Sequence, residues 1–273
     1  MKSIIAIFAL QFFLIFATAQ AVEADYQTIE NISYYEQADI TDDYQKERCV
    51  LDLYYPADMD SFATVVWFHG GGIRGGEKFI PVQLENKGIA VLAVNYRLYP
   101  KVKNPVYIED AAASVAWAFK HIEEYGGMKD RIFVSGHSAG GYLTSMIGLD
   151  TSYLQKHDVD ANDIAGLIPF SGHAITHFTV REERGIDGKQ VVVDKYAPIA
   201  LIRNDAPPYT IITADRDMEL LGRYEENAFM WRMMQLIEHP DCTLYELEGY
   251  HHGDMYVPAL GILLKEIKRI LGK

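Results

Sequence analysis

The sequence predicts an α/β fold with a mostly parallel central sheet and helices on both faces. Short apolar runs with strand character alternate along the chain with longer segments whose apolar residues recur at helical spacing. This alternation is typical of a parallel sheet, because each crossover between parallel strands needs a long connection, usually a helix. Glycine-rich and polar loops follow several of the apolar runs. Because ligands of open α/β sheets bind at the carboxyl ends of strands, we expect the functional residues in these loops.

The individual elements follow from the same patterns. Residues 20–48 are polar and rich in tyrosine, and we expect them to lead into the first strands. Residues 50–55 alternate in part between apolar and polar, which predicts an antiparallel edge strand that Pro56 ends. Further strands are expected at 64–68, 90–96, 131–135, 165–171, 208–214 and 242–247. Helices are expected at 110–125, 142–149, 218–237 and 259–271.

Residues 173–196 interrupt the alternation of strands and helices. The segment is rich in charged residues and glycine, and it is too short to form a domain. We interpret it as a small lid inserted into the fold. Because the chain shows neither internal repeats nor a linker-like stretch, residues 20–273 are expected to form a single domain.

The first residues have the pattern of an export signal. Lys2 precedes an almost wholly apolar run at residues 4–16, and Ala17-Thr18-Ala19 supplies small residues at a cleavage position. Residues 1–19 are therefore predicted to be a signal peptide, and the mature protein is expected to be periplasmic or secreted. An uncleaved membrane anchor is the alternative, but the apolar run is short for a membrane span. We expect no stable membrane association after signal cleavage.

Composition narrows the classes of partner. The chain has 273 residues, 49% of them hydrophobic, and a formal net charge of −13 at pH 7. These values fit a globular domain with a large core. An acidic protein repels the phosphates of nucleic acids, so no nucleic-acid partner is expected.

The most informative motif surrounds Ser138. Residues 136–140 have the pattern G-x-S-x-G, with a strand predicted before them and a helix after them. In this context the serine occupies a sharp, strained turn that exposes its hydroxyl as a nucleophile. An ordinary glycine-rich turn is the alternative. The amide of Ala139, at the start of the helix, would lie beside the hydroxyl.

A second motif, His69-Gly70-Gly71-Gly72, follows the strand predicted at 64–68. Acyl transfer turns a carbonyl oxygen into an oxyanion that needs fixed N–H donors. Glycines let the backbone approach a substrate and present its amides. Gly71, Gly72 and Ala139 are the predicted oxyanion donors. A phosphate-binding loop is disfavoured, because the lysine and serine or threonine of such loops do not follow.

With these motifs, the chain resembles the α/β-hydrolases, and among them the hormone-sensitive-lipase-like esterases and the bifunctional feruloyl/acetyl (xylan) esterases. The resemblance extends over most of the chain, roughly residues 45–271. It implies the α/β-hydrolase fold and a catalytic triad in the order serine, aspartate, histidine. The residues that carry the resemblance are His69-Gly70-Gly71-Gly72, Asn95-Tyr96-Arg97-Leu98-Tyr99-Pro100, Glu109-Asp110-Ala111, the turn around Ser138, Asp217 and His252.

The acid and the base of such a triad are expected on the loops after the last two strands. The resemblance places the acid at Asp217, and Asp215, which is nearer the strand end, is the alternative. The base of the family usually precedes a glycine, which selects His252 over His251. The neighbouring imidazole would then order the loop or border the substrate.

The remaining histidines are expected to have other roles. His137 is expected to pack or form a local hydrogen bond, and His173 and His177 to border the pocket or belong to the lid. His121, His157 and His239 are expected at the surface. No metal site is expected, because the adjacent His251 and His252 have no third ligand nearby in the sequence, and the spacing of His173 and His177 is only a weak indication of one.

These observations predict a serine carboxylesterase with the triad Ser138, Asp217 and His252. No metal or organic cofactor is needed for this chemistry. The expected substrate is a small acyl ester or an acylated glycan, with an acyl group of acetyl or feruloyl type. The alternatives are a non-catalytic binding protein that retains the hydrolase fold, and a peptidase or amidase of the same fold.

Overall fold

A computed structural model describes residues 24–272, which contain one eight-stranded sheet with the order β1-β2-β4-β3-β5-β6-β7-β8. β2 pairs antiparallel with β1 and β4, and every later pair is parallel, so the prediction of a mostly parallel sheet is confirmed. The signal peptide expected at 1–19 lies outside the described residues. The strands are Tyr26–Ser33 (β1), Val50–Pro56 (β2), Phe62–Phe68 (β3), Ile89–Val94 (β4), Gly127–His137 (β5), Gly166–Phe170 (β6), Tyr209–Ala214 (β7) and Cys242–Leu247 (β8).

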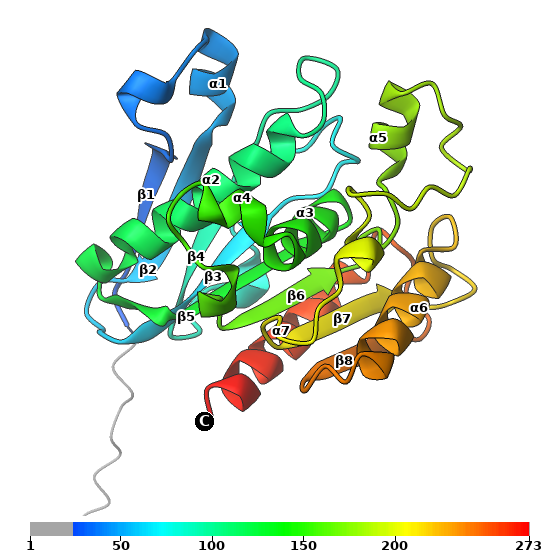
Figure 1. Ribbon diagram of the computed structural model, residues 1–273. Helices are drawn as coiled ribbons and strands as arrows, with labels where there is room; N and C mark the ends of the chain where they lie inside the picture. Colours follow the sequence, from blue (N-terminus) through cyan, green and yellow to red (C-terminus); the bar gives the residue numbers. More distant parts are fainter. Residues whose placement is uncertain (1–23, 273) are drawn as a thin grey trace, which may run out of the picture.

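Helices cover both faces of the sheet (Figure 1). α2, α3 and α6 pack on one face, α7 packs on the other, and α5 lies beyond the carboxyl ends of the strands. The α-helices of residues 24–272 are Asp43–Arg48 (α1), Val106–His121 (α2), Ala139–Leu149 (α3), Thr151–Gln155 (α4), Phe178–Glu183 (α5), Arg223–Leu236 (α6) and Tyr256–Ile270 (α7).

The core is divided in two by the sheet, because successive side chains of a strand point to opposite faces. In β3, Val66 and Phe68 belong to the cluster that includes side chains of α2 and α3. Val65 and Trp67 of the same strand pack with the cluster that includes α7. All four are nearly fully buried, which explains why the strand has a continuous apolar sequence rather than an alternating one.

Among the elements that differ from the sequence predictions, two change the edge of the sheet and the surroundings of the site. β2 is antiparallel as expected, but β1 pairs with its outer side, so β2 is the second strand rather than the edge. The helix expected at 218–237 begins only at Arg223, after Gly222 with a φ of 68°. Residues 218–222 form a turn instead, and this turn brings Glu219 inward, as the site below shows.

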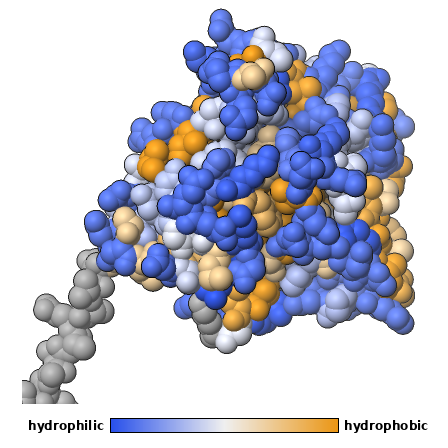
Figure 2. Space-filling view, turned by 60° about the vertical axis from the view of Figure 1, so that its left-hand side comes forward, coloured by the Kyte–Doolittle hydropathy of each residue, from blue (hydrophilic) through white to orange (hydrophobic). Residues whose placement is uncertain are grey.

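The surface is mostly hydrophilic on the face shown in Figure 2, where apolar side chains form small separate patches. Such scattered apolar residues are usual for a globular protein. Within residues 24–272, none of the helices has both the length and the apolar character that crossing a bilayer requires.

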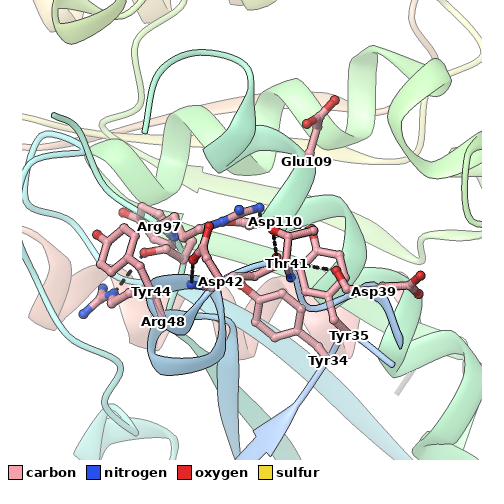
Figure 3. A network of polar contacts seen from close by, with 12 residues as sticks. Tyr34, Tyr35, Asp39, Thr41, Asp42, Tyr44, Arg48, Arg97, Glu109 and Asp110 are labelled. Atoms are coloured by element: carbon pink, nitrogen blue, oxygen red, sulfur yellow. Dashed lines mark hydrogen bonds and ion pairs between the residues drawn. The ribbon is translucent and has the colours of Figure 1, made fainter. Parts of the chain in front are cut away.

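A buried ion pair joins the loop after β4 to α2 (Figure 3). The guanidinium of Arg97 contacts both carboxylate oxygens of Asp110 at 2.6 and 2.9 Å, and the Arg97 amide donates to the same carboxylate at 3.0 Å. The Tyr35 hydroxyl donates to Asp110 at 2.9 Å. The Asp110 side chain is fully buried. This pair therefore connects three segments of the chain, and two of the motifs that carried the resemblance, Asn95–Pro100 and Glu109–Ala111, meet in it.

Asp110→Ala is expected to lower the free energy of unfolding by about 3–5 kcal/mol, because it leaves the Arg97 charge buried without its partner. The neighbouring Glu109→Ala is the matched control. Glu109 pairs with Lys156 at 3.0 Å, but both side chains are exposed, so its loss should cost under about 1 kcal/mol. Urea denaturation of the two variants measures the difference, and equal losses would contradict the assignment.

Candidate active site

Ser138 lies in a sharp turn between β5 and α3, at the carboxyl edge of the sheet. Its backbone has a φ of 58° and a ψ of −111°, a strained conformation for a residue with a side chain. Close packing holds the turn in place, since a Cβ on Gly140 would lie 2.1 Å from the carbonyl oxygen of Phe68. The Ser138 amide also donates to the Phe170 carbonyl at 2.8 Å. The sequence motif thus corresponds to a strand, a strained turn and a helix.

His252 faces the hydroxyl of Ser138. Its Nε2 lies 2.8 Å from Ser138 Oγ, and its Nδ1 lies 2.6 Å from Oε1 of Glu219. A carboxylate can only accept, so Nδ1 carries a proton and Nε2 is free to accept the hydroxyl proton. His251 lies on the same loop but is exposed and pairs with Asp254 at 3.0 Å. The structure therefore brings His252, and not His251, to Ser138.

The acid partner of His252 is Glu219, so the prediction of Asp217 is wrong. Asp217 is exposed, and its amide donates to the Asp215 carboxylate at 2.9 Å. Two residues further along, the turn at 218–222 directs Glu219 back toward the strand ends.

The Glu219 carboxylate is buried and fully hydrogen-bonded. The amides of Ala214 and Leu220 donate to it at 3.1 and 2.7 Å, and the hydroxyl of Ser171 also donates to it. Burial by itself raises the pKa of Glu219, but the hydrogen bond and charge of His252 and the Ser171 hydroxyl lower the pKa to about 2. Glu219 is thus a carboxylate at neutral pH, as a partner for an imidazolium requires.

Asp215, the alternative acid, connects the loop after β7 to the loop after β8. Its carboxylate accepts the amide of Gly249 at 2.8 Å, and its own amide donates to the Tyr250 carbonyl at 3.0 Å. These contacts join the loop that carries Glu219 to the loop that carries His252. The carboxylate nearest the strand end therefore positions the site rather than contacting the imidazole.

His137 supports the same loop from the other side. Its Nε2 lies 2.8 Å from the carbonyl oxygen of His252, and the two rings lie 4.8 Å apart. Burial is the main reason that the pKa of His137 is lowered to about 3, so the ring is neutral and donates through Nε2. The contact expected to be local in sequence instead spans 115 residues.

The glycine loop after β3 lies against Ser138. A Cβ on Gly70 would be 3.5 Å from the Cβ of Ser138. The Gly71 carbonyl accepts the amides of Arg74 and Gly75 at 3.0 and 3.1 Å, which directs the N–H of Gly72 away from this turn. A Cβ on Gly71 would lie 2.1 Å from the Gly75 carbonyl oxygen, so only glycine fits.

The third predicted oxyanion donor is Ala139, the residue after the nucleophile. It is the first residue of α3, and the first amides of a helix have no partner within the helix. The predicted donors Gly71, Gly72 and Ala139 thus belong to the two segments that meet at Ser138. Amides at a helix start and in a glycine loop suit an oxyanion.

The lid segment, residues 173–196, packs on this glycine loop. The Thr179 hydroxyl donates to the Gly72 carbonyl at 2.6 Å, and Arg74 forms an ion pair with Glu182. The Phe178 ring lies against Gly72, at 3.0 Å from the position of a Cβ there. The segment therefore forms one wall beside the predicted oxyanion site.

His173 and His177, at the start of the lid segment, are buried. Nδ1 of His173 pairs with Glu226 at 2.8 Å, and Nδ1 of His177 accepts the Thr179 amide at 3.1 Å. Burial lowers the pKa of both imidazoles well below the usual value. His239, expected at the surface, is also buried and contacts the Ala206 carbonyl at 3.0 Å. Within residues 24–272, the structure places no three metal-ligating side chains together.

The sequence profile of the BD-FAE family matches residues 51–235. The chain belongs to the BD-FAE family. This family consists of α/β-hydrolase esterases, so the resemblance drawn from the sequence is confirmed. The matched residues include the glycine loop, the turn around Ser138 and Glu219, but not the strand β1, the helix α1 or the loop that carries His252.

Curated relatives of this BD-FAE chain are named as esterases. A probable isoprenylcysteine alpha-carbonyl methylesterase of Oryza sativa subsp. japonica is 26% identical over 83% of this chain and 60% of its own length. Esterase LipC of Mycobacterium tuberculosis is 26% identical over 75% of this chain and 56% of its own length. The chain thus spans less than two thirds of the length of these relatives.

A solved structure shares the fold of the BD-FAE chain. A truncated form of a carbohydrate esterase from gut microbiota aligns with a TM-score of 0.73, over 92% of this chain and 98% of its own. The sequence identity is 15%, so this likeness concerns the fold. It confirms the predicted fold class.

Glu219→Gln is expected to slow the reaction of Ser138 with a fluorophosphonate probe by about 10³- to 10⁴-fold, because an amide neither holds the required tautomer nor stabilises the imidazolium. Asp217→Asn is the matched control on the same loop and should react like the unmodified protein. The rate of covalent labelling, followed by intact-protein mass spectrometry, measures both. The opposite ranking of the two variants would restore Asp217 as the acid.

The Glu219 carboxyl also predicts a pH dependence of stability. Its pKa is about 2 in the folded protein, whereas a glutamate in an unfolded chain has a pKa of about 4.3. A carboxyl with a lowered folded pKa stabilises the protein above the unfolded pKa and ceases to do so as the pH falls through the folded value. The stability advantage over Glu219→Gln should therefore be constant above about pH 5 and shrink toward about pH 2. Urea unfolding at stepped pH measures it, and an advantage that grows on acidification would refute the assignment.

Proposed function

We propose that this protein is an exported serine carboxylic ester hydrolase that removes short acyl groups, of acetyl or feruloyl type, from polysaccharides. The observation that carries the hydrolase proposal is the hydrogen-bonded series of Ser138, His252 and Glu219, with contacts of 2.8 and 2.6 Å. A hydroxyl, a base and an orienting carboxylate in this geometry suit nucleophilic acyl transfer.

In the first half of the proposed reaction, Ser138 Oγ attacks the ester carbonyl carbon while its proton passes to Nε2 of His252. The carbonyl electron pair becomes an oxyanion that accepts hydrogen bonds from the amides of Gly71, Gly72 and Ala139. The carbonyl then re-forms, and the bond to the alcohol oxygen breaks. His252 gives its proton to this oxygen, and Glu219 stabilises the imidazolium in between.

The second half repeats these steps with water as the nucleophile. Water adds to the acyl group on Ser138 and gives a proton to His252. The bond between the acyl carbon and Ser138 Oγ breaks, the serine regains its proton, and the carboxylic acid leaves. The side chains of Ser138, His252 and Glu219, together with the donor amides of the glycine loop and α3, account for both halves of the reaction.

The acyl group is proposed to be small on the basis of the lid segment. Phe178 packs against Gly72, and Thr179 binds the carbonyl of the same glycine at 2.6 Å. An aromatic ring beside the oxyanion loop limits the room for an acyl chain on that side. Within the acetyl or feruloyl class, this wall favours acetyl.

The polysaccharide substrate and the export rest on likeness and on the N-terminal sequence. A protein of the same fold is named a carbohydrate esterase from gut microbiota. Residues 1–19 have the pattern of a signal peptide, which would bring the enzyme to polymers outside the cell. N-terminal sequencing of the protein from its own cells tests the export, since cleavage at the expected position gives a chain that begins at Gln20.

The proposed activity is tested by comparing the hydrolysis of p-nitrophenyl acetate by the unmodified protein, Ser138→Ala and His251→Gln. Ser138→Ala should lose about five to six orders of magnitude in kcat, because the nucleophile is removed. His251→Gln is the control, since this histidine is exposed and does not contact Ser138. Hydrolysis that does not depend on Ser138, together with no fluorophosphonate labelling, would contradict the proposal and favour a non-catalytic binding protein.

The same samples test the substrate class. Incubation with acetylated xylan should release acetate at a rate that Ser138→Ala abolishes. Good hydrolysis of p-nitrophenyl acetate without acetate release from acetylated glycans would leave the esterase in place and refute the polysaccharide substrate.

A further inference from the structure

Arg48 reaches from α1 beneath the glycine loop. Its side chain is buried, and it comes from a helix that precedes the residues matched by the family profile. Its Nε donates to the Tyr96 carbonyl at 3.1 Å, and its terminal nitrogens contact Glu77 at 2.5 Å and the Gly76 carbonyl at 3.1 Å. A terminal nitrogen also faces Nε2 of His69 at 3.5 Å. One guanidinium therefore contacts both ends of the loop at 69–77.

The contacts of His69 determine its tautomer. Its Nδ1 lies 2.6 Å from the carbonyl oxygen of Gly70, which can only accept, so Nδ1 carries the proton. Its Nε2 faces Arg48, which can only donate, so Nε2 offers its lone pair. The two contacts require the same neutral tautomer. Burial lowers the pKa of His69 to about 4, and the Arg48 charge acts in the same direction.

The hydrogen bond from His69 also fixes the next peptide. The C=O and the N–H of a trans peptide point in opposite directions. Because the Gly70 carbonyl points to the His69 ring, the N–H of Gly71 points away from that ring. Gly70 lies against Ser138, so this peptide borders the nucleophile. The orientation of a predicted oxyanion donor thus depends on the state of His69.

Neighbouring tyrosines hold the His69 ring and the helix α1 in place. Tyr96 stacks on His69 with ring centroids 4.5 Å apart, and its hydroxyl donates to the His69 carbonyl at 2.9 Å. Tyr44 of α1 accepts the Leu98 amide at 3.0 Å. Figure 3 shows Arg48 and Tyr44 in the same network as Arg97 and Asp110. The short helix α1 is therefore anchored to the loop after β4.

We propose that Arg48 is a positioning residue for the glycine loop. Arg48 holds His69 in its Nδ1–H tautomer and thereby directs the Gly71 amide. The guanidinium does this because its planar fork reaches several acceptors at once and it remains charged at every working pH. The catalytic consequence rests on the proposed ester hydrolysis, whereas the tautomer of His69 does not.

The tautomer is measured by nitrogen NMR of 15N-histidine-labelled protein, with His69 assigned through His69→Gln. The unmodified protein should show His69 with Nδ1 protonated and Nε2 unprotonated. In Arg48→Met the signals should shift toward the other tautomer or an exchanging mixture. An unchanged His69 tautomer in folded Arg48→Met would overturn the proposal, whether or not the protein is an esterase.

The kinetic test uses p-nitrophenyl acetate and separates kcat from KM. Arg48→Met is expected to lower kcat about 10- to 100-fold with KM changed less than about 3-fold, because a displaced oxyanion donor acts on the transition state. Arg48→Lys keeps the charge but lacks the fork, so it should recover only a small part of kcat. Full recovery by lysine would mean that the residue only supplies charge, and would overturn the positioning role.

Lys46→Met is the matched control, because Lys46 is exposed on the same helix. Its kcat and its His69 signals should equal those of the unmodified protein. Thermal unfolding of all variants identifies any that do not fold, and Arg48→Lys then provides the comparison if Arg48→Met is unfolded. Absence of hydrolysis in the unmodified protein, with the expected change of tautomer, would refute the proposed function and support the role of Arg48 in the loop.

Discussion

The contact between His252 and the buried carboxylate of Glu219 is the interaction on which the arrangement of the site depends. The carboxylate alone would be costly to bury, but two backbone amides, a serine hydroxyl and the imidazole bind it. In return, the carboxylate fixes which nitrogen of His252 faces Ser138. The tautomer and the direction of the His252 ring thus follow from one buried carboxylate that is hydrogen-bonded by the protein.

The parallel sheet makes this contact possible, because it gathers the ends of distant strands at one edge. Ser138 follows β5, Glu219 lies in the turn after β7, and His252 lies after β8. Asp215 then fastens the last two of these loops together through the Gly249 amide. The strands supply the approximate position of each side chain, and a few hydrogen bonds between loops set the final contact distances.

The glycine loop is supported on two sides by residues that lie outside the sheet. Arg48 of α1 contacts it from beneath, through His69 and the Gly76 carbonyl. Thr179 of α5 holds the Gly72 carbonyl from the other side. A loop rich in glycine has little conformational preference of its own. These external contacts therefore provide the preorganisation that stabilising an oxyanion requires.

The sequence by itself determined the local features. Short apolar runs predicted seven of the strands, and apolar residues at helical spacing predicted four of the helices. The glycines around Ser138 predicted the strained turn, because close backbone contacts there exclude other residues. The resemblance to the family selected His252 through the following glycine. The sequence did not select Glu219, because three carboxylates lie between residues 215 and 219 and their local patterns are alike. Only the tertiary structure decided among them. The turn at 218–222, which replaced the first turns of an expected helix, directs Glu219 inward and leaves Asp217 in solvent. The role of Arg48 likewise depends on contacts with residues 21 to 48 positions away, which no local pattern encodes.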